Sequence, residues 1–239
     1  MIRVREFTAP KLGNKPEENE DYLLFDSGRM KFAVADGASD SIFSGVWARA
    51  LVESYVQSNL SLFDDGAFIE QLVRTARDRW YEEIKWDQLK LFVKNKAING
   101  SFSTFTALEG RDSGDAIEFR VVSVGDSCFL RNDNGALDSF PLSRPEDFNI
   151  SPKLIWSGYG SPFSKEFKWR KPDFKSMSFT SASVDFVLAT DSVSKWIIEY
   201  YPESWDHIID GNTLELFSGE ISMKKMRNDD LTFLHITTT

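Results

Sequence analysis

Short apolar segments separated by turn-forming residues mark the start of the predicted structure. Residues 22–25 (YLLF) and 32–35 (FAVA) are two such segments, and the sequence DSGR stands between them. Apolar segments of this length on either side of a turn composition predict a β-hairpin. In a hairpin, the start of the first strand lies beside the end of the second.

Helical spacing replaces this pattern from Ser44 and indicates two helices. The apolar face of the first helix consists of Trp47, Ala50, Leu51 and Tyr55. The second is predicted to begin near Asp64 or Asp65, either of which is a suitable N-cap, and to continue to about Val93. Its apolar stripe consists of Ile69, Leu72, Val73, Ala76, Trp80 and Ile84.

Strand patterns return in the second half of the chain. They occur at residues 101–108, 117–124, 128–130, 186–190 and 231–236. A further helix is predicted at 194–201. Residues 141–180 contain five of the eight prolines, which predicts an irregular insertion. Strands at both ends, with helices between and after them, predict an α+β fold with a mainly antiparallel sheet.

The composition is that of a folded, acidic protein. Hydrophobic residues make up 41% of the 239 positions, and 14 glycines and 8 prolines are too few for a low-complexity chain. A formal net charge of −9 disfavours nucleic acids and anionic membranes as partners, because like charges repel. No apolar run reaches the roughly 18 residues of a membrane-spanning helix. No secretory signal is visible, and the single Cys128 cannot form an internal disulfide. We expect residues 1–239 to form one cytoplasmic, monomeric domain without membrane or nucleic-acid partners.

Carboxylates stand at the ends of the predicted strands. Glu20 and Asp21 precede the first hairpin strand and Asp36 follows the second. All three are therefore expected to emerge at one edge of the sheet. Aspartate is also common in turns, which gives each single position a structural explanation as well.

A second group of acids flanks the last two strands. Asp191 ends the strand at 186–190, while Asp229 and Asp230 precede the final strand. Antiparallel pairing of these strands would bring their acids together. Asp126 ends a further strand.

Two such groups facing each other would form a site for hard divalent cations. Clustered carboxylates raise each other's pKa values by repulsion, and bound cations relieve that repulsion. Oxygen ligands without His or Cys favour Mg²⁺ or Mn²⁺ over zinc. Two ions about 3.5–4 Å apart can hold a phosphoryl group and activate water for its hydrolysis.

These acids fall within five short motifs that follow one another along the chain. The motifs are NED at 19–21, VADG at 34–37, VGDS at 124–127, LATD at 188–191 and NDDLT at 228–232. In order and strand context they resemble the motifs of the metal-dependent serine/threonine protein phosphatases of type 2C, in their bacterial single-domain form. The resemblance covers residues from about 13 to 237. It implies a four-layer α-β-β-α sandwich, with two antiparallel β-sheets flanked by helix pairs.

The resemblance also implies a centre of two Mn²⁺ or Mg²⁺ ions at one end of the sandwich. The matched metal-binding positions are Glu20, Asp36, Gly37, Asp126, Asp191 and Asp229. Asp36 would bridge both ions, and Glu20 and the Gly37 carbonyl would bind the first of them. Asp191 and Asp229 would bind the second ion. Asp126 matches a position that supports a third ion in some relatives. Asp21 would orient the bound waters, of which one attacks phosphorus without a covalent intermediate.

The match departs from the family pattern at four positions. Pro16 stands where many relatives have an arginine that binds the substrate phosphate. The neighbouring Lys15 could supply that charge, or be an ordinary solvated lysine. Ala38 replaces a histidine of eukaryotic relatives, and Ser192 replaces the usual glycine. Asp230 replaces the usual asparagine, which leaves open which of the two neighbouring aspartates binds the ion.

The insertion at 141–180 lies where this family has a mobile flap beside the active site. Trp156, Tyr159 and Trp169 could contact the substrate there or fix the insertion to the body of the protein. We favour the second interpretation.

The expected function is hydrolysis of phosphoserine and phosphothreonine in proteins, with a cognate kinase as a further candidate partner. An alternative of another class is a catalytically silent module that binds a phosphorylated partner or a kinase. An acidic Ca²⁺-binding domain is disfavoured, because no segment has EF-hand spacing. Nucleotide-binding glycine loops and a nucleophile-elbow serine are also missing from the sequence.

Overall fold

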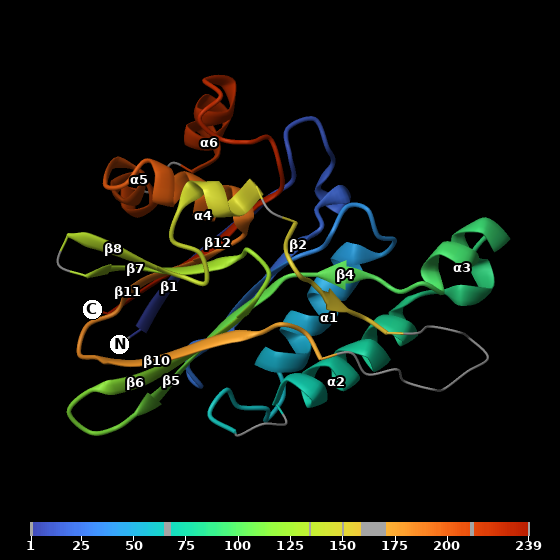
Figure 1. The fold of residues 1–239 in the computed structure, drawn as a ribbon, viewed down its shortest axis with the longest axis horizontal. Helices are drawn as coiled ribbons and strands as arrows, with labels where there is room; N and C mark the ends of the chain where they lie inside the picture. Colours follow the sequence, from blue (N-terminus) through green and yellow to red (C-terminus); the bar gives the residue numbers. More distant parts are fainter. Residues whose placement is uncertain are drawn as a thin grey trace.

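The computed structural model describes residues 2–64, 68–133, 135–149, 151–158, 171–210 and 213–238. In this part of the chain, two five-stranded antiparallel sheets lie face to face, and helices cover the outer face of each (Figure 1). The predicted α+β sandwich is therefore confirmed.

Every pairing within the two sheets is antiparallel. The first sheet consists of β1 (Ile2–Ala9), β7 (Cys128–Asp133), β8 (Ala136–Phe140), β11 (Asp185–Ala189) and β12 (Leu231–Thr238), in the order β1-β12-β11-β7-β8. The second consists of β2 (Asp21–Asp26), β3 (Lys31–Asp36), β5 (Phe105–Asp112), β6 (Ile117–Val124) and β10 (Lys175–Ser181), in the order β10-β6-β5-β3-β2. Two short strands pair separately, β4 (Phe102–Ser103) and β9 (Ile155–Trp156).

The helices fall into two groups along the chain. Between β3 and β4 lie α1 (Ser44–Val56), α2 (Phe68–Glu83) and α3 (Leu91–Ala97). Between β11 and β12 lie α4 (Asp191–Glu199), α5 (Glu203–Asp210) and α6 (Thr213–Ser222). Short 3-10 segments occur at Pro16–Glu18, Trp86–Gln88 and Pro145–Asn149. No helix in the described ranges combines the length and the apolar character that a membrane crossing needs.

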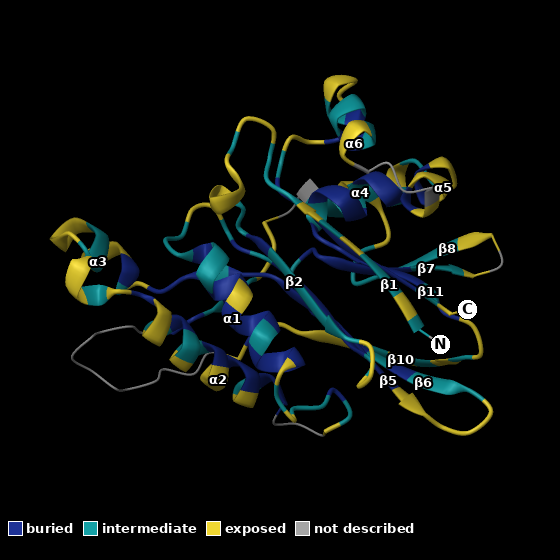
Figure 2. Ribbon diagram, turned by 180° about the vertical axis from the view of Figure 1, so that it is seen from behind, coloured by how far each residue is buried: buried dark blue, intermediate teal, exposed yellow. Residues whose placement is uncertain are grey.

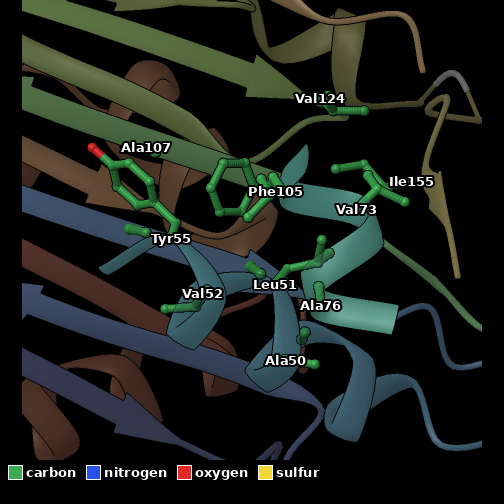
Figure 3. Close-up of a cluster of buried hydrophobic side chains, with 14 of the residues drawn as sticks. Ala50, Leu51, Val52, Tyr55, Val73, Ala76, Phe105, Ala107, Val124 and Ile155 are labelled. Carbon is green, nitrogen blue, oxygen red and sulfur yellow. The ribbon is translucent and has the colours of Figure 1, made fainter. Parts of the chain in front are cut away.

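Strand β3 shows how an alternating pattern builds the layers. Phe32 and Val34 pack between the two sheets, whereas Ala33 and Ala35 face α1 and α2. The alanines are small, so the apolar side of α1 can pack closely on the sheet. Figure 3 shows the result, with Tyr55 and neighbouring residues of α1 and α2 packed against β5.

A third cluster packs α4, α5 and α6 on the outer face of the first sheet, with Trp196 and Phe233 at its centre. Figure 2 shows buried residues along the inner strands and on α1 and α4. Exposed residues are prominent on α3, which extends away from the sandwich. The sandwich therefore has three apolar layers, one between the sheets and one under each group of helices.

The second predicted helix is shorter than expected. Helix α2 ends at Glu83 rather than near Val93, and α3 is a separate helix. The Trp86 indole N–H donates to the Tyr81 carbonyl at 2.8 Å, which satisfies an acceptor that a further helical turn would have used. Of the two predicted N-caps for this helix, Asp65 lies outside the described residues.

The predicted insertion at 141–180 is not irregular throughout. Its last residues form β10, which pairs with β6 at the edge of the second sheet. Met177 and Phe179 alternate with polar residues in this strand, and the Phe179 ring stacks on Phe119 at 5.4 Å. This part of the prediction is therefore wrong, and the sequence analysis also missed β1 and β8.

Candidate metal centre

The β2–β3 hairpin ends with two acids side by side. Asp21 and Asp36 are direct partners across the hairpin, as predicted. Beyond them, the Gly37 N–H donates to the Glu20 carbonyl at 3.1 Å. A Cβ on Gly37 would lie 2.5 Å from the carbonyl carbon of Ser44. Only glycine therefore allows α1 to begin directly against the end of the hairpin.

The ends of β11 and β12 form the other part of the site. These strands pair antiparallel, as predicted, and the Thr190 N–H donates to the Thr232 carbonyl at 3.0 Å. Helix α4 begins at Asp191, earlier than the predicted start at 194. The Asp191 carboxylate therefore stands in the first turn of a helix, where the positive end of the helix dipole favours a negative charge.

Five aspartates line one cavity of about 420 Å³ at this end of the sandwich. One is Asp40, in the loop after β3, and the other four are Asp36, Asp126, Asp191 and Asp229. They come from the end of β3, the turn after β6, the start of α4 and the segment before β12. The fold thus brings together four of the six positions for which a metal-binding role was predicted.

Burial and mutual repulsion raise the pKa values of these acids. The pKa of Asp36 lies well above its usual range because the carboxyl is buried and because Asp21 and Asp191 repel its charge. Burial, followed by repulsion from Asp191, raises the pKa of Asp126 to about 7. The pKa of Asp191 is raised by burial and by Asp229. This excess of negative charge favours a bound cation.

The chemistry of the donors fits a hard divalent cation. Apart from Arg227, the ionisable side chains that the structure describes on the cavity wall are all carboxylates, which are ligands that Mg²⁺ and Mn²⁺ accept. Among the residues that the structure describes, however, no three Asp, Glu, His or Cys side chains are arranged as a metal site. Binding of an ion therefore requires these side chains to move toward a common point.

Asp230 differs from its neighbour Asp229 in its contacts. The residue is 7% exposed, and its carboxylate accepts hydrogen bonds from the backbone N–H groups of Lys11 and Glu20, both at 2.8 Å. These bonds join the N-terminal segment and the first motif to the start of β12. Asp229 therefore lines the cavity, while Asp230 holds backbone segments together.

Glu20 and Asp21 lie beside the cavity. The Glu20 carboxylate accepts hydrogen bonds from the hydroxyls of Ser44 and, at 2.7 Å, Ser39. Ser39 itself lines the cavity and connects Glu20 to it. Asp21 is buried, which raises its pKa well above the usual range, and its carboxylate accepts a hydrogen bond from Thr190 Oγ1 at 2.8 Å. That bond joins the two sheets at the site.

Among the described residues of the cavity wall, the one cation is Arg227, which the sequence analysis did not single out. Its Nε lies 3.2 Å from Asp229 Oδ2, and its Nη1 lies 3.8 Å from Asp191 Oδ2. Lys15, the predicted phosphate ligand, is exposed beside a 3-10 turn and is not among the described residues of the cavity wall. The sequence signal that could have identified Arg227 is the basic run KKMR at 224–227, which ends two residues before Asp229.

Part of the predicted insertion forms one side of the cavity. Its contributing residues are Phe148, Ser151, Pro152 and Leu154. The Trp156 indole N–H donates to the Asn99 carbonyl at 2.8 Å, which fixes this segment to the body of the protein as we favoured. Tyr159 and Trp169 lie outside the described residues.

No family model and no curated protein matches the chain. Solved structures do match it. The catalytic domain of the serine/threonine protein phosphatase PstP, in complex with two manganese ions, is 16% identical, with a TM-score of 0.61 over 99% of this chain and 97% of that one. PppA, a key regulatory component of T6SS in Pseudomonas aeruginosa, is 15% identical, with a TM-score of 0.60 over 99% and 98%. The serine/threonine phosphatase Stp1 from Staphylococcus aureus is 13% identical, with a TM-score of 0.60 over 100% and 96%.

These similarities establish the fold. The chain has the sandwich fold of bacterial type 2C serine/threonine phosphatases over nearly the full length of each structure, as the five motifs predicted. A shared fold does not by itself determine activity, which has to be argued from the site.

Proposed function

We propose that this protein is a metal-dependent protein phosphatase that hydrolyses phosphoserine and phosphothreonine. The supporting observation is that aspartates from four separate segments, Asp36, Asp126, Asp191 and Asp229, line one cavity. These carboxylates belong to four of the five motifs that carry the family resemblance.

In this proposal, Asp36, Asp191 and Asp229 hold two Mn²⁺ or Mg²⁺ ions, and Asp126 supports a third. Bound ions would supply positive charge to the phosphoryl oxygens and lower the pKa of the attacking water. The Gly37 carbonyl, at the end of the hairpin, adds a neutral oxygen donor beside Asp36.

Two further acids, from the first motif, lie beside these ligands. Glu20 acts through the Ser39 hydroxyl, to which it is hydrogen bonded. Asp21 orients water from a position that its hydrogen bond with Thr190 maintains.

We assign the substrate phosphate to Arg227 in place of Lys15. Arg227 is on the cavity wall, and its planar guanidinium can donate two parallel hydrogen bonds to a phosphate. It would thereby supply the positive charge that many relatives provide with an arginine at the position of Pro16.

A second candidate function is a catalytically silent module that binds a phosphorylated partner or a kinase. The ion pairs of Arg227 with Asp191 and Asp229 favour it, because they give two proposed metal ligands a cationic partner within the chain. An arginine that stays in place would compete with a metal ion for the same oxygens.

Hydrolysis of para-nitrophenyl phosphate and of a phosphothreonine peptide, with Mn²⁺, Mg²⁺ or EDTA, tests the proposal. Asp36→Asn removes a charge from the cavity, and Asp115→Asn, in an exposed turn between β5 and β6, is the matched control. We expect metal-dependent turnover that Asp36→Asn abolishes and Asp115→Asn leaves unchanged. Mn²⁺ binding measured by calorimetry without any turnover would support the silent module. Absence of both turnover and Mn²⁺ binding would refute the phosphatase proposal.

A further inference from the structure

A second cavity, of about 550 Å³, adjoins the candidate metal centre. Phe148, Asp191 and Arg227 line both cavities and therefore stand at the boundary between them. The rest of the wall comes from α4 and its C-terminal end, the end of α6 and the segment between α6 and β12. We call this cavity the side pocket.

The side pocket is rich in basic residues. Its charged lining residues are Lys195, Lys224, Lys225 and Arg227 against Asp191 and Glu199. Such a positive excess contrasts with the formal net charge of −9 for the chain. A cavity lined by one sign of charge attracts ligands of the opposite sign, so the side pocket is suited to an anion.

Contacts within the protein leave part of this charge accessible. Lys225 Nζ lies 3.9 Å from the Glu220 carboxylate and 5.5 Å from the centre of the Tyr200 ring. Lys224 is exposed, and it has no ion-pair partner among the residues that the structure describes. The Arg227 side chain is 73% exposed. Lys224 can therefore reach an incoming anion without giving up an ion pair among the described residues.

The backbone at the end of α6 is strained where these lysines stand. Lys224 has a φ of 59°, a left-handed conformation in which glycine is the usual residue at a helix end. Hydrogen bonds from Lys224 N–H to the Ile221 carbonyl, at 3.0 Å, and from Lys225 N–H to the Glu220 carbonyl, at 2.9 Å, hold this turn. A basic residue here also has a structural explanation, because cations are favoured near the C-terminus of a helix.

Apolar side chains complete the lining. Trp196, Tyr200 and Met226 belong to the same wall, and the Trp196 indole is held by a 3.0 Å hydrogen bond to Glu220. The volume and this mixed lining suit a side chain with an apolar stem and an anionic end.

We propose that the side pocket binds an anionic residue of the substrate, either a carboxylate or a second phosphoryl group, next to the phosphorylated residue. The inference rests on the proposed function, since it places the target phosphate in the adjoining cavity. It specifies the substrate class, namely phosphoproteins with an acidic or phosphorylated residue close to the target.

Three peptides, each with one target phosphothreonine, test this inference. The neighbouring residues are neutral in the first peptide, glutamates in the second and a phosphoserine in the third. We expect kcat/KM for the two anionic peptides to exceed that of the neutral peptide by about three- to tenfold, mainly through KM. The difference should shrink in about 0.5 M salt, because salt screens exposed charges. A comparison of kcat/KM between the glutamate peptide and the phosphoserine peptide identifies which anion the side pocket prefers.

Variants of Lys224 separate charge from structure. Lys224→Gly removes the charge and suits the left-handed backbone, so it should unfold in urea at no lower concentration than the wild type. It should also reduce the preference for anionic peptides toward unity, while Lys224→Arg should retain it. Lys90→Gln, an exposed lysine at the start of α3, is the matched control and should leave the preference unchanged.

Equal kcat/KM for the three peptides in the wild type, or a preference that Lys224→Gly does not change, would overturn the inference. If no peptide is hydrolysed, the proposed function fails and binding decides the inference. Fluorescence anisotropy of the same peptides in EDTA measures that binding. Tighter binding of anionic peptides that Lys224→Gly weakens would support the side pocket, and equal binding of all three peptides would refute it.

Discussion

Replacing Gly37 by alanine would add a Cβ where the fold has no space for one. The added atom would lie 2.5 and 2.6 Å from the carbonyl carbon and oxygen of Ser44, and 2.9 Å from the carbonyl oxygen of Glu20. All three are backbone atoms, so no side-chain rotation can relieve the contacts. The end of the β2–β3 hairpin and the start of α1 would have to separate.

Two terms set the size of the effect. Overpacking of this kind costs about 1–3 kcal/mol. Separation would also weaken the 3.1 Å hydrogen bond from the Gly37 N–H to the Glu20 carbonyl, a bond worth roughly 0.5–1.5 kcal/mol. We therefore expect Gly37→Ala to lower the free energy of unfolding by about 1.5–4.5 kcal/mol. Because Gly37 follows Asp36, the variant should also bind Mn²⁺ more weakly.

Urea unfolding, followed by tryptophan fluorescence, measures the first effect. Gly219→Ala is the matched control, because Gly219 lies in α6 with nothing within 4 Å of its added Cβ. Alanine is the better helix former, so the control should stabilise the protein by about 0.5–1 kcal/mol. A Gly37→Ala variant within about 0.5 kcal/mol of the wild type would refute the steric reasoning.

Three further predictions concern the carboxylates of the site. Asp230→Asn should lower the free energy of unfolding by about 1–3 kcal/mol in urea, because an amide cannot accept from both backbone N–H groups that Asp230 now binds. In EDTA, the thermal midpoint should fall as pH rises from 5 to 8. The Asp126 carboxyl, with a pKa of about 7 when folded, keeps a proton that the unfolded chain loses near its ordinary pKa, so stabilisation present at low pH is lost as pH rises through 7. Arg227→Gln should tighten Mn²⁺ binding by about fivefold in calorimetry, because it removes a positive charge beside two proposed ligands.

A control or a contradicting outcome accompanies each of these predictions. Asp115→Asn should leave urea unfolding unchanged. An Asp230→Asn variant that also leaves it unchanged would contradict the role of Asp230 in holding the backbone segments together. A midpoint that rises between pH 5 and 8 in EDTA would contradict the raised pKa values. Saturating Mn²⁺ should stabilise the protein, by about 2.7 kcal/mol at a hundred times the dissociation constant. For Arg227→Gln, the control is Lys90→Gln, and unchanged or weaker Mn²⁺ binding would exclude competition by the arginine.

Much of the fold could be predicted because local pattern and pairing agree. Residues 22–25 and 32–35 are apolar segments on either side of a turn composition, and the structure pairs Tyr22 with Ala35 in the expected hairpin. A shift by one residue would move every side chain of β3 to the opposite face and put Phe32 and Val34 under the helices, so the alternation of large and small side chains specifies the register. The acids at the strand ends therefore come together as expected.

Elements that depend on a distant partner were harder to predict. Nothing in the apolar stripe of α2 indicates that it ends at Glu83, because the end depends on the Trp86 indole folding back onto Tyr81. Strand β10 has few apolar residues and becomes a strand through pairing with β6 at a sheet edge. Such decisions rest on tertiary contacts that override weak local preferences.

The sequence by itself determined which segments supply the acids, because each acid follows or precedes a strand whose pairing can be predicted. Only the tertiary structure decided which side chains face the cavity. Asp229 and Asp230 are adjacent and chemically identical, yet the backbone N–H groups of Lys11 and Glu20, 219 and 210 positions away, bind Asp230. The same long-range packing places Arg227 on the cavity wall. Side-chain orientation at a strand end depends on such hydrogen-bond partners, which the local sequence does not contain.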